Sequence, residues 1–223
     1  MTDAMDDLAA EVASLRAEIE AMRTELTVQR INIIEPDGTL RATISSSSRS
    51  HGGQIEDLRL ASRDGQRPAG LTFFNDEGTE CGGLVFGGGE QDGTRDHHVH
   101  LSFDRFRNDQ AIYLQCSDFG ETWSAALQVQ DRPAESLAPV IRRAMEIEAM
   151  QDGPGRQAAL DELRGAQAGA PLRVFLGRDQ QGRATLALHD GEQRPRLRMS
   201  VALDGTATLE FLDHNGEVVS ALP

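Results

Sequence analysis

The sequence predicts a mainly β protein: an antiparallel, hairpin-rich barrel, sandwich or prism-like domain with an N-terminal coiled-coil helix and a small helical insertion. Three observations lead to this prediction. Apolar residues repeat in heptads near the N-terminus, they alternate with polar residues over most of the chain from residue 28, and a helical pattern interrupts the alternation at residues 134–170. We therefore expect an oligomerisation helix at residues 1–30 and a β domain at residues 31–223.

The predicted N-terminal helix covers residues 4–30. Its apolar residues recur in steps of three and four, at Met5, Leu8, Val12, Leu15, Ile19, Met22 and Leu26. This seam is narrower than the stripe by which a helix usually packs on its own domain, and so favours a self-associating coiled coil. Because a helix of about three heptads is marginal alone in water, we expect the following domain to share the assembly.

The β domain is predicted from runs of alternating residues that are separated by glycine-containing turns. INIIEPDGTLRATIS, which begins at residue 31, and LRVFLGRDQQGRATLALHD, which begins at residue 172, are typical. Turn signals stand at residues 36–38, 63–65, 75–78, 179–182, 189–191, 203–205 and 213–216. The pattern predicts roughly ten to twelve antiparallel strands in a repetitive meander.

The predicted insertion contains two short helices. SLAPVIRRAMEIEAMQ and RQAALDELRG have helical patterns, and the DGPG turn between them stops the first helix. AQAGAP at residues 166–171 then forms a linker back to the strands.

Composition restricts the class of function. The net charge is −14 and all 22 basic residues are arginines, so a nucleic-acid partner is not expected and lysine-based catalysis is excluded. No apolar run is long enough to span a membrane, and the N-terminus lacks the apolar region of a signal peptide. We expect a cytoplasmic protein without a cofactor. Cys81 and Cys116 form no CxxC motif and are expected to be reduced.

The segment RDHHVHLSFDRFRNDQ at residues 95–110 is the densest group of chemically active side chains. Alternation places Val99 and Leu101 on one face of a strand, and His98 and His100 on the other. We interpret the second face as a solvated strand surface. The alternative is a metal site at His98 and His100, completed by another ligand such as His51 or His189.

The acidic residues of this region provide a second candidate site. Asp104 and Asp109 flank Arg105 and Arg107, and a pair of carboxylates whose pKa values are pushed apart can act as general acid and base. The same residues can equally form a structural turn. Further candidates are Glu80 as a third acid, and Asp76, Glu77, Tyr113 and Trp123 as ligand contacts.

The glycine-rich segment GLTFFNDEGTECGGLVFGGGEQDG at residues 70–93 is followed by a strand pattern, so it is not a phosphate-binding loop. Glycines inside strands usually mark bulges or close backbone contacts, including contacts near an oligomer axis.

Two resemblances are carried by these motifs. HVHLSFD at residues 98–104 partly resembles the first metal-binding motif of cupins, although an aspartate replaces the usual glutamate and Ala111 stands where a glycine is expected. NDEGTECGGLVFGG, FDRFRNDQ, DRP at residues 131–133 and the terminal LEFLDHNGEVVSALP together resemble a group of bacterial proteins with an N-terminal heptad helix and no assigned activity. The second resemblance implies architecture, and it suggests that the acidic and glycine-rich segments form one site.

Two classes of function follow from the sequence. The first is a non-catalytic homo-oligomer, a trimer rather than a dimer, that binds a small ligand or a partner through its β surface. The second is a cofactor-independent acid–base enzyme, an isomerase, lyase or cyclase, with an acidic site between subunits. A partly apolar cleft that contains Asp104 and Asp109 with raised pKa values would favour the enzyme.

Overall fold

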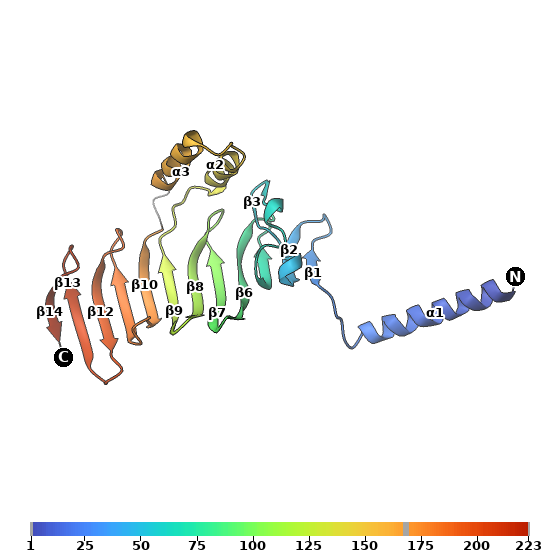
Figure 1. The fold of residues 1–223 in the computed structure, drawn as a ribbon, viewed down its shortest axis with the longest axis horizontal. Coiled ribbons are helices and arrows are strands. Elements are labelled where there is room, and N and C mark those ends of the chain that lie inside the picture. Colours follow the sequence, from blue (N-terminus) through green and yellow to red (C-terminus); the bar gives the residue numbers. More distant parts are fainter. Residues whose placement is uncertain (1, 167–169, 223) are drawn as a thin grey trace.

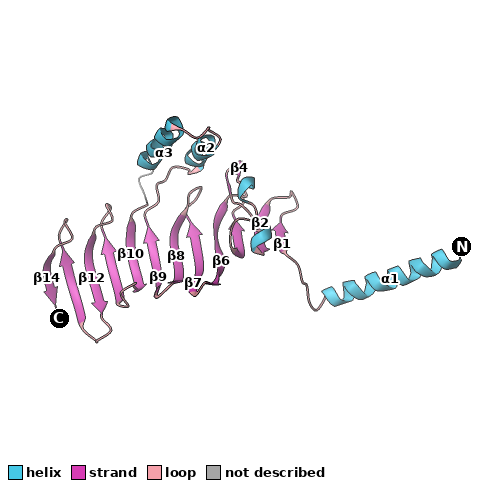
Figure 2. Ribbon diagram, viewed as in Figure 1, coloured by secondary structure: helices cyan, strands magenta, loops and turns pink. Residues whose placement is uncertain are grey.

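The computed structural model describes residues 2–166 and 170–222. One large antiparallel sheet forms the body of the protein, and helix α1 (Thr2–Met22) extends from the β1 end of it (Figures 1 and 2). The twelve strands of this sheet, in spatial order, are β1 (Arg30–Ile34), β2 (Leu40–Ser45), β5 (Ala69–Phe74), β6 (Glu80–Gln91), β7 (Thr94–Asp104), β8 (Gln110–Phe119), β9 (Thr122–Gln130), β10 (Leu172–Arg178), β11 (Ala184–His189), β12 (Pro195–Val201), β13 (Ala207–Leu212) and β14 (Val218–Leu222).

The predicted mainly β, antiparallel class is therefore confirmed, and so is the meander. The predicted barrel is wrong for the single chain, because β1 and β14 stay at opposite edges of an open sheet. A sandwich does not form within the chain either, since the strands make a single large layer (Figure 2).

Side-chain caps explain why the turns form where the sequence predicts them. The Asp37 carboxylate accepts the Thr39 N–H at 2.9 Å, and the Asp204 carboxylate accepts the Thr206 N–H at 2.9 Å. Asn75 accepts two backbone N–H groups in the same way. Such local bonds satisfy the backbone of a tight turn, and the glycine after them supplies the positive φ.

The predicted hairpin turn at residues 63–65 is wrong. This segment follows a 3₁₀ turn, Ala61–Arg63, inside the connection between β2 and β5. Asp64 there accepts the Gly52 N–H at 2.7 Å and pairs with Arg59. The carboxylate thus holds the connection together and does not cap a hairpin of the sheet.

Residues 46–68, between β2 and β5, form the cover of one sheet face. They contain a small hairpin of β3 (Gln54–Ile55) and β4 (Leu58–Arg59). Beneath them, Thr43 and Thr72 are buried, and the ring of His51 meets that of Phe74 at 4.7 Å. This cover contributes much of the buried apolar core that the described chain has.

The same arginine contact recurs at the ends of several strands. An extra residue bulges from one strand near several turns, and at three of these places it is an arginine: Arg41, Arg173 and Arg196. The guanidinium of each donates to a carbonyl of a neighbouring strand, on Phe74, His189 and Leu212 respectively. The similar hairpins of the sequence therefore also repeat a side-chain contact.

The N-terminal helix is shorter than predicted. It ends at Met22, because the Arg23 and Thr24 N–H groups make short-range bonds and the Thr24 hydroxyl also donates to the Ala21 carbonyl. Leu26 therefore lies outside the helix. Every side chain described from Met5 to Met22 is exposed, and pairing with another chain stays a prediction.

The predicted helical insertion is confirmed as α2 (Ala138–Glu148) and α3 (Pro154–Ala166); the linker residues 167–169 lie outside the described residues. Asn108, in the β7–β8 turn, attaches the insertion to the sheet by donating to the carbonyls of Pro133 and Glu135 at 3.1 and 2.8 Å. Within the described ranges, no helix has the length and apolar composition to cross a membrane.

Replacing the buried Asn108 by alanine should lower the free energy of unfolding by about 1–3 kcal/mol, because it removes the side chain's hydrogen bonds to the carbonyls of Pro133 and Glu135 and from the Asp109 N–H. Urea unfolding followed by circular dichroism measures the change. Asn215→Ala, in an exposed turn, is the matched control and should change stability by less than about 0.5 kcal/mol. Equal losses in the two variants would contradict the anchoring role of Asn108.

Candidate functional site

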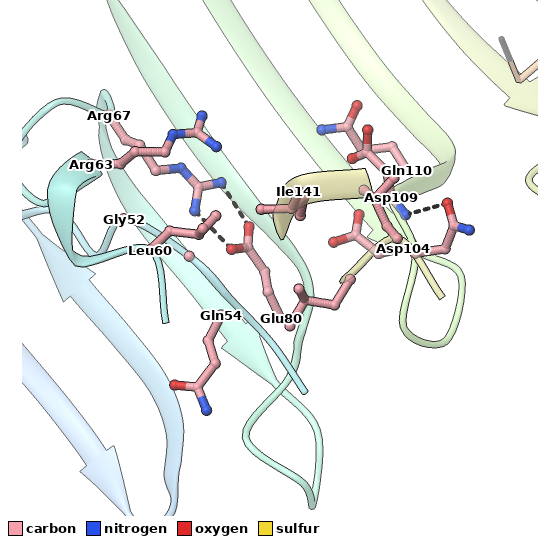
Figure 3. A pocket seen from close by; sticks show the side chains of 14 residues that line it. Gly52, Gln54, Leu60, Arg63, Arg67, Glu80, Asp104, Asp109, Gln110 and Ile141 are labelled. Carbon is pink, nitrogen blue, oxygen red and sulfur yellow. Dashed lines mark hydrogen bonds and ion pairs between the residues drawn. The ribbon is translucent and has the colours of Figure 1, made fainter. Parts of the chain in front are cut away.

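A cavity of about 330 Å³ lies where three parts of the chain meet: the 46–68 cover, the ends of β6, β7 and β8, and the beginning of α2. We call it the Asp104 cavity (Figure 3). Its apolar lining comes from Ile55, Leu60, Leu137 and Ile141. Its polar lining comes from Gln54, Arg63, Arg67, Glu80, Asp104, Asn108, Asp109 and Gln110.

Two bulges lie beside the carboxylates of this cavity. Phe73 pairs with Gly82, but Phe74 pairs with Glu80, so Cys81 is an extra residue in β6. Phe103 pairs with Ile112 and Asp104 with Gln110, so Ala111 is an extra residue in β8. A bulge bends its own strand and redirects the next side chain, which explains why Glu80 takes the place opposite Phe74 that Cys81 would otherwise have. Asp104 keeps the alternation of β7 and lies on the same face as Ser102.

Glycine in β6 permits the close backbone contacts near these bulges. Gly82 has a φ of 133°, and a Cβ there would lie 2.3 Å from the Ser102 carbonyl oxygen. Gly88 has a φ of 120° and a similarly close neighbour in β7. The predicted role of these glycines in bulges and tight backbone contact is confirmed. Their close neighbours are backbone atoms of β7 in the same sheet, so a contact near an oligomer axis stays a prediction.

Glu80 forms an ion pair with Arg67 within the cavity. Its carboxylate accepts two hydrogen bonds from the Arg67 guanidinium, at 2.7 and 2.8 Å. Both side chains are largely covered, with exposed fractions of 19% and 26%. This bidentate pair fixes the geometry of the wall opposite Asp104.

Asp104 is the unusual member of the group. Its Oδ1 is buried and has no hydrogen-bond partner among the residues described. Burial, followed by the negative charges of Glu80 and Asp109, raises the pKa of its carboxyl to about 7, against a smaller opposing effect of Arg67 and Arg132. At neutral pH the group therefore exists in both protonated and ionised forms.

The β7–β8 turn holds the third acid. Arg105 N–H donates to the Asp109 carbonyl at 3.0 Å, and this closes the turn. The Asp109 carboxylate lies 3.4 Å from Arg132, whose Nε donates to the Gln110 carbonyl. The predicted charged turn after the strand is thus confirmed, and Asp109 faces the same cavity as Asp104.

Arg105 and Arg107 do not line the Asp104 cavity. The Arg105 guanidinium donates to the Arg132 carbonyl, and Arg107 pairs with Glu77 at 2.9 Å and with Glu56 at 3.6 Å. The arginines in the cavity are Arg63 and Arg67. Within the described residues, the Arg63 side chain has no ion pair or hydrogen bond, which leaves its charge free for a ligand.

The structure also places the other candidate ligand contacts away from the cavity. Asp76 pairs with Arg41 at 2.7 Å and its side chain is 91% exposed. Tyr113 hydrogen-bonds to Gln128 on the sheet surface. Trp123 lies at the other end of the β8–β9 hairpin, beneath the Arg178 guanidinium at 3.9 Å.

The alternation predicted for the histidine strand is confirmed, but the predicted solvated surface is wrong: His98 and His100 are only partly exposed, and Ser102 on the same face is buried. His100 stacks near Tyr113 with ring centroids 5.0 Å apart, and its Nε2 is buried without a partner. Burial lowers the pKa of His100 and of His189. Over residues 2–166 and 170–222, no group of three or more histidine, cysteine or acidic side chains could hold a metal ion, so nothing joins His98 and His100 as a third ligand.

Sequence reasoning missed Arg63, Arg67 and the apolar half of the cavity. Residues 46–68 break the alternation of the strands and contain Gly52 and Gly53. That irregularity was a usable signal for a functional loop. Nothing local could show that Leu137 and Ile141 meet this loop.

Searches of protein-family models, of curated proteins and of solved structures found no match to the chain.

The raised pKa of Asp104 has a consequence for stability. Between about pH 4 and pH 7 the unfolded carboxyl ionises while the folded one keeps its proton, so stability from this group falls as pH rises through that window and stays low above it. Asp104→Asn removes the charge, and should raise the free energy of unfolding by about 1–3 kcal/mol at pH 8 and by little at pH 4.

Urea unfolding at both pH values measures this difference. Asp96→Asn, whose wild-type side chain is 70% exposed and lies outside the cavity, is the control and should show no such pH dependence. An Asp104→Asn protein that is less stable than the wild type at pH 8 would show that ionised Asp104 does not destabilise the fold.

Proposed function

We propose that the Asp104 cavity binds a small organic molecule and that Asp104 exchanges a proton with it, as in an isomerase, lyase or cyclase. One observation carries this proposal: the buried, unpartnered Oδ1 of Asp104 belongs to a carboxyl with a pKa of about 7. A general acid or base works best when its pKa lies near the operating pH. A strongly shifted carboxyl in a cavity is a typical sign of a functional site.

The other acids support this role by keeping a proton on Asp104. Glu80 forms a bidentate ion pair with Arg67, and Asp109 lies beside Arg132. Their negative charges favour the neutral form of Asp104. Asp104 in this arrangement is the group that takes or gives the proton, and burial together with the two paired carboxylates raises its affinity for that proton.

The lining suggests the class of substrate. Leu60, Leu137 and Ile141 offer an apolar wall for a carbon skeleton, and the unpaired charge of Arg63 attracts an anionic group such as a carboxylate. The volume of about 330 Å³ lies at the lower end of the range for small-molecule pockets. We therefore propose a small organic acid that has an exchangeable proton near Asp104.

Non-catalytic ligand binding is the second candidate. The paired states of Glu80 and Asp109 favour it, because only one carboxyl of the three is left for chemistry. The same cavity and the same Arg63 contact would then serve recognition alone.

The experiment that tests the proposal begins with a thermal-shift screen of small carboxylic acids at pH 7. Compounds that bind are incubated with the protein in deuterium oxide, and deuterium in the recovered compound is measured by NMR. We expect Asp104→Asn to keep binding but to slow incorporation by about a hundredfold or more. Arg63→Ala should weaken binding of the acid, and Asp96→Asn should change neither property.

Binding that depends on Arg63, without incorporation by the wild-type protein, would support the non-catalytic function. Incorporation that is unchanged in Asp104→Asn would contradict the role of Asp104. If neither Arg63→Ala nor Asp104→Asn alters the binding of any compound, the cavity is not the site.

A further inference from the structure

A continuous apolar row crosses the whole sheet. The registers of neighbouring strands place one aliphatic residue of each strand opposite that of the next. The row consists of Ile31, Ile44, Leu71, Leu84, Leu101, Leu114, Leu127, Leu176, Leu186, Met199, Leu209 and Leu222.

This row lies on a face that none of the described residues covers. None of its members is buried, and Leu114, Leu176 and Leu222 are 49%, 52% and 54% exposed. Flanking positions on the same face add Phe86, Phe103 and Phe211, which are 50%, 52% and 41% exposed. A sheet buries its apolar face against another layer in a stable fold, so this face requires a partner.

The opposite face differs in composition. Its central row is mixed: it carries Thr43, Thr72, Ser102, Gln128 and Arg198, together with Tyr113, Phe175 and Ala187. The 46–68 cover lies on that face, where His51 meets Phe74. Among the described residues, none covers the apolar face.

The exposed area also exceeds that of a compact monomer. The chain exposes 14681 Å², whereas a folded monomer of this length exposes about 10,000 Å². The excess of several thousand Å² falls in the range that permanent oligomers bury, about 2,000–5,000 Å².

Helix α1 supplies a second uncovered seam. The apolar heptad residues of the helix are all exposed: Val12 has the smallest exposed fraction, 40%, and Met5 the largest, 69%. The helix extends the long dimension of the molecule beyond β1, the direction in which the aliphatic row crosses the strands (Figure 1). In a parallel coiled coil the symmetry axis runs along the helices, so the same axis follows the aliphatic row.

We propose that second copies of this chain cover the apolar face, in a trimer whose axis runs along α1 and the row of aliphatic residues. Three sheets then face one another around the axis, and three helices continue the same apolar core as a coiled coil. The occupant is the chain itself because the helix and the sheet present collinear apolar seams. An unrelated partner would have to match both.

The width of the apolar face fits three copies. Val99, Leu101 and Phe103 span five residues of β7, or about 17 Å of extended strand. The centre of an equilateral triangle with sides of that length is about 5 Å from each side. Packed sheets lie about 10 Å apart, so the side chains of three such walls would fill the interior.

Light scattering coupled to size-exclusion chromatography tests the proposal on the full chain. The expected result is the mass of three chains at micromolar concentration. The mass of one chain would overturn the proposal. A dimer would overturn the number of copies and the triangular arrangement.

Adjacent residues of β8 offer a matched pair of variants. Leu114 points to the apolar face and Gln115 to the opposite face. Leu114→Asp should abolish the trimer, because it places a charge in the shared core, and Gln115→Asp should leave the mass unchanged. A trimeric Leu114→Asp protein would overturn the assigned surface.

A thiol measurement keeps the proposal testable if Leu114→Asp does not fold. Cys116 lies on the apolar face between Val99 and Ala125. In a Cys81→Ser protein, where Cys116 is the sole thiol, Ellman's reagent should react only after denaturation. Fast reaction of the folded protein would show that the face is open and would overturn the proposal.

Discussion

The antiparallel register of the sheet is the constraint on which the rest of the structure depends. Each strand of the meander brings an aliphatic residue into one shared row, from Ile31 on β1 to Leu222 on β14. Because side chains alternate between the faces, a shift by one residue would move a strand's apolar set to the polar side. The tight turns and bulges therefore matter as much as the strands, since they fix where each strand begins its alternation.

The same bulges that keep this register also create the site. The extra residue Cys81 turns Glu80 to the face of the sheet on which the alternation of β7 already places Asp104, and the extra residue Ala111 lies in β8 opposite the end of β7. The 46–68 cover and the start of α2 then close the space around these acids. A flat sheet without the two irregular connections would leave Asp104 in water, where its carboxyl would have an ordinary pKa.

Sequence predicted what depends on local pattern and missed what depends on distant contacts. The heptads, the alternating strands and the α2–α3 insertion were recognisable because each has its own period and its own stop signals. The sequence could not show that the sheet stays open, because alternation indicates which residues share a face and not whether the edge strands pair with each other. Asp104 and Asp109 were correctly grouped from their spacing of five residues. Arg63 and Ile141 join them only through the folded chain, so their part in the site carried no local signature.

Asp104 and the apolar face illustrate two different ways in which a structure departs from maximal stability. The exposed apolar face is unfavourable in an isolated chain, and in the proposed trimer the other copies would remove that cost. No such relief exists for Asp104: its ionisation is opposed by burial and by Glu80 and Asp109 within the same chain. A neutral side chain of the same shape would avoid that cost, yet the chain keeps a carboxyl there. Functional sites commonly carry such a stability cost, and this is the physical argument for proposing Asp104 as the group that exchanges the proton.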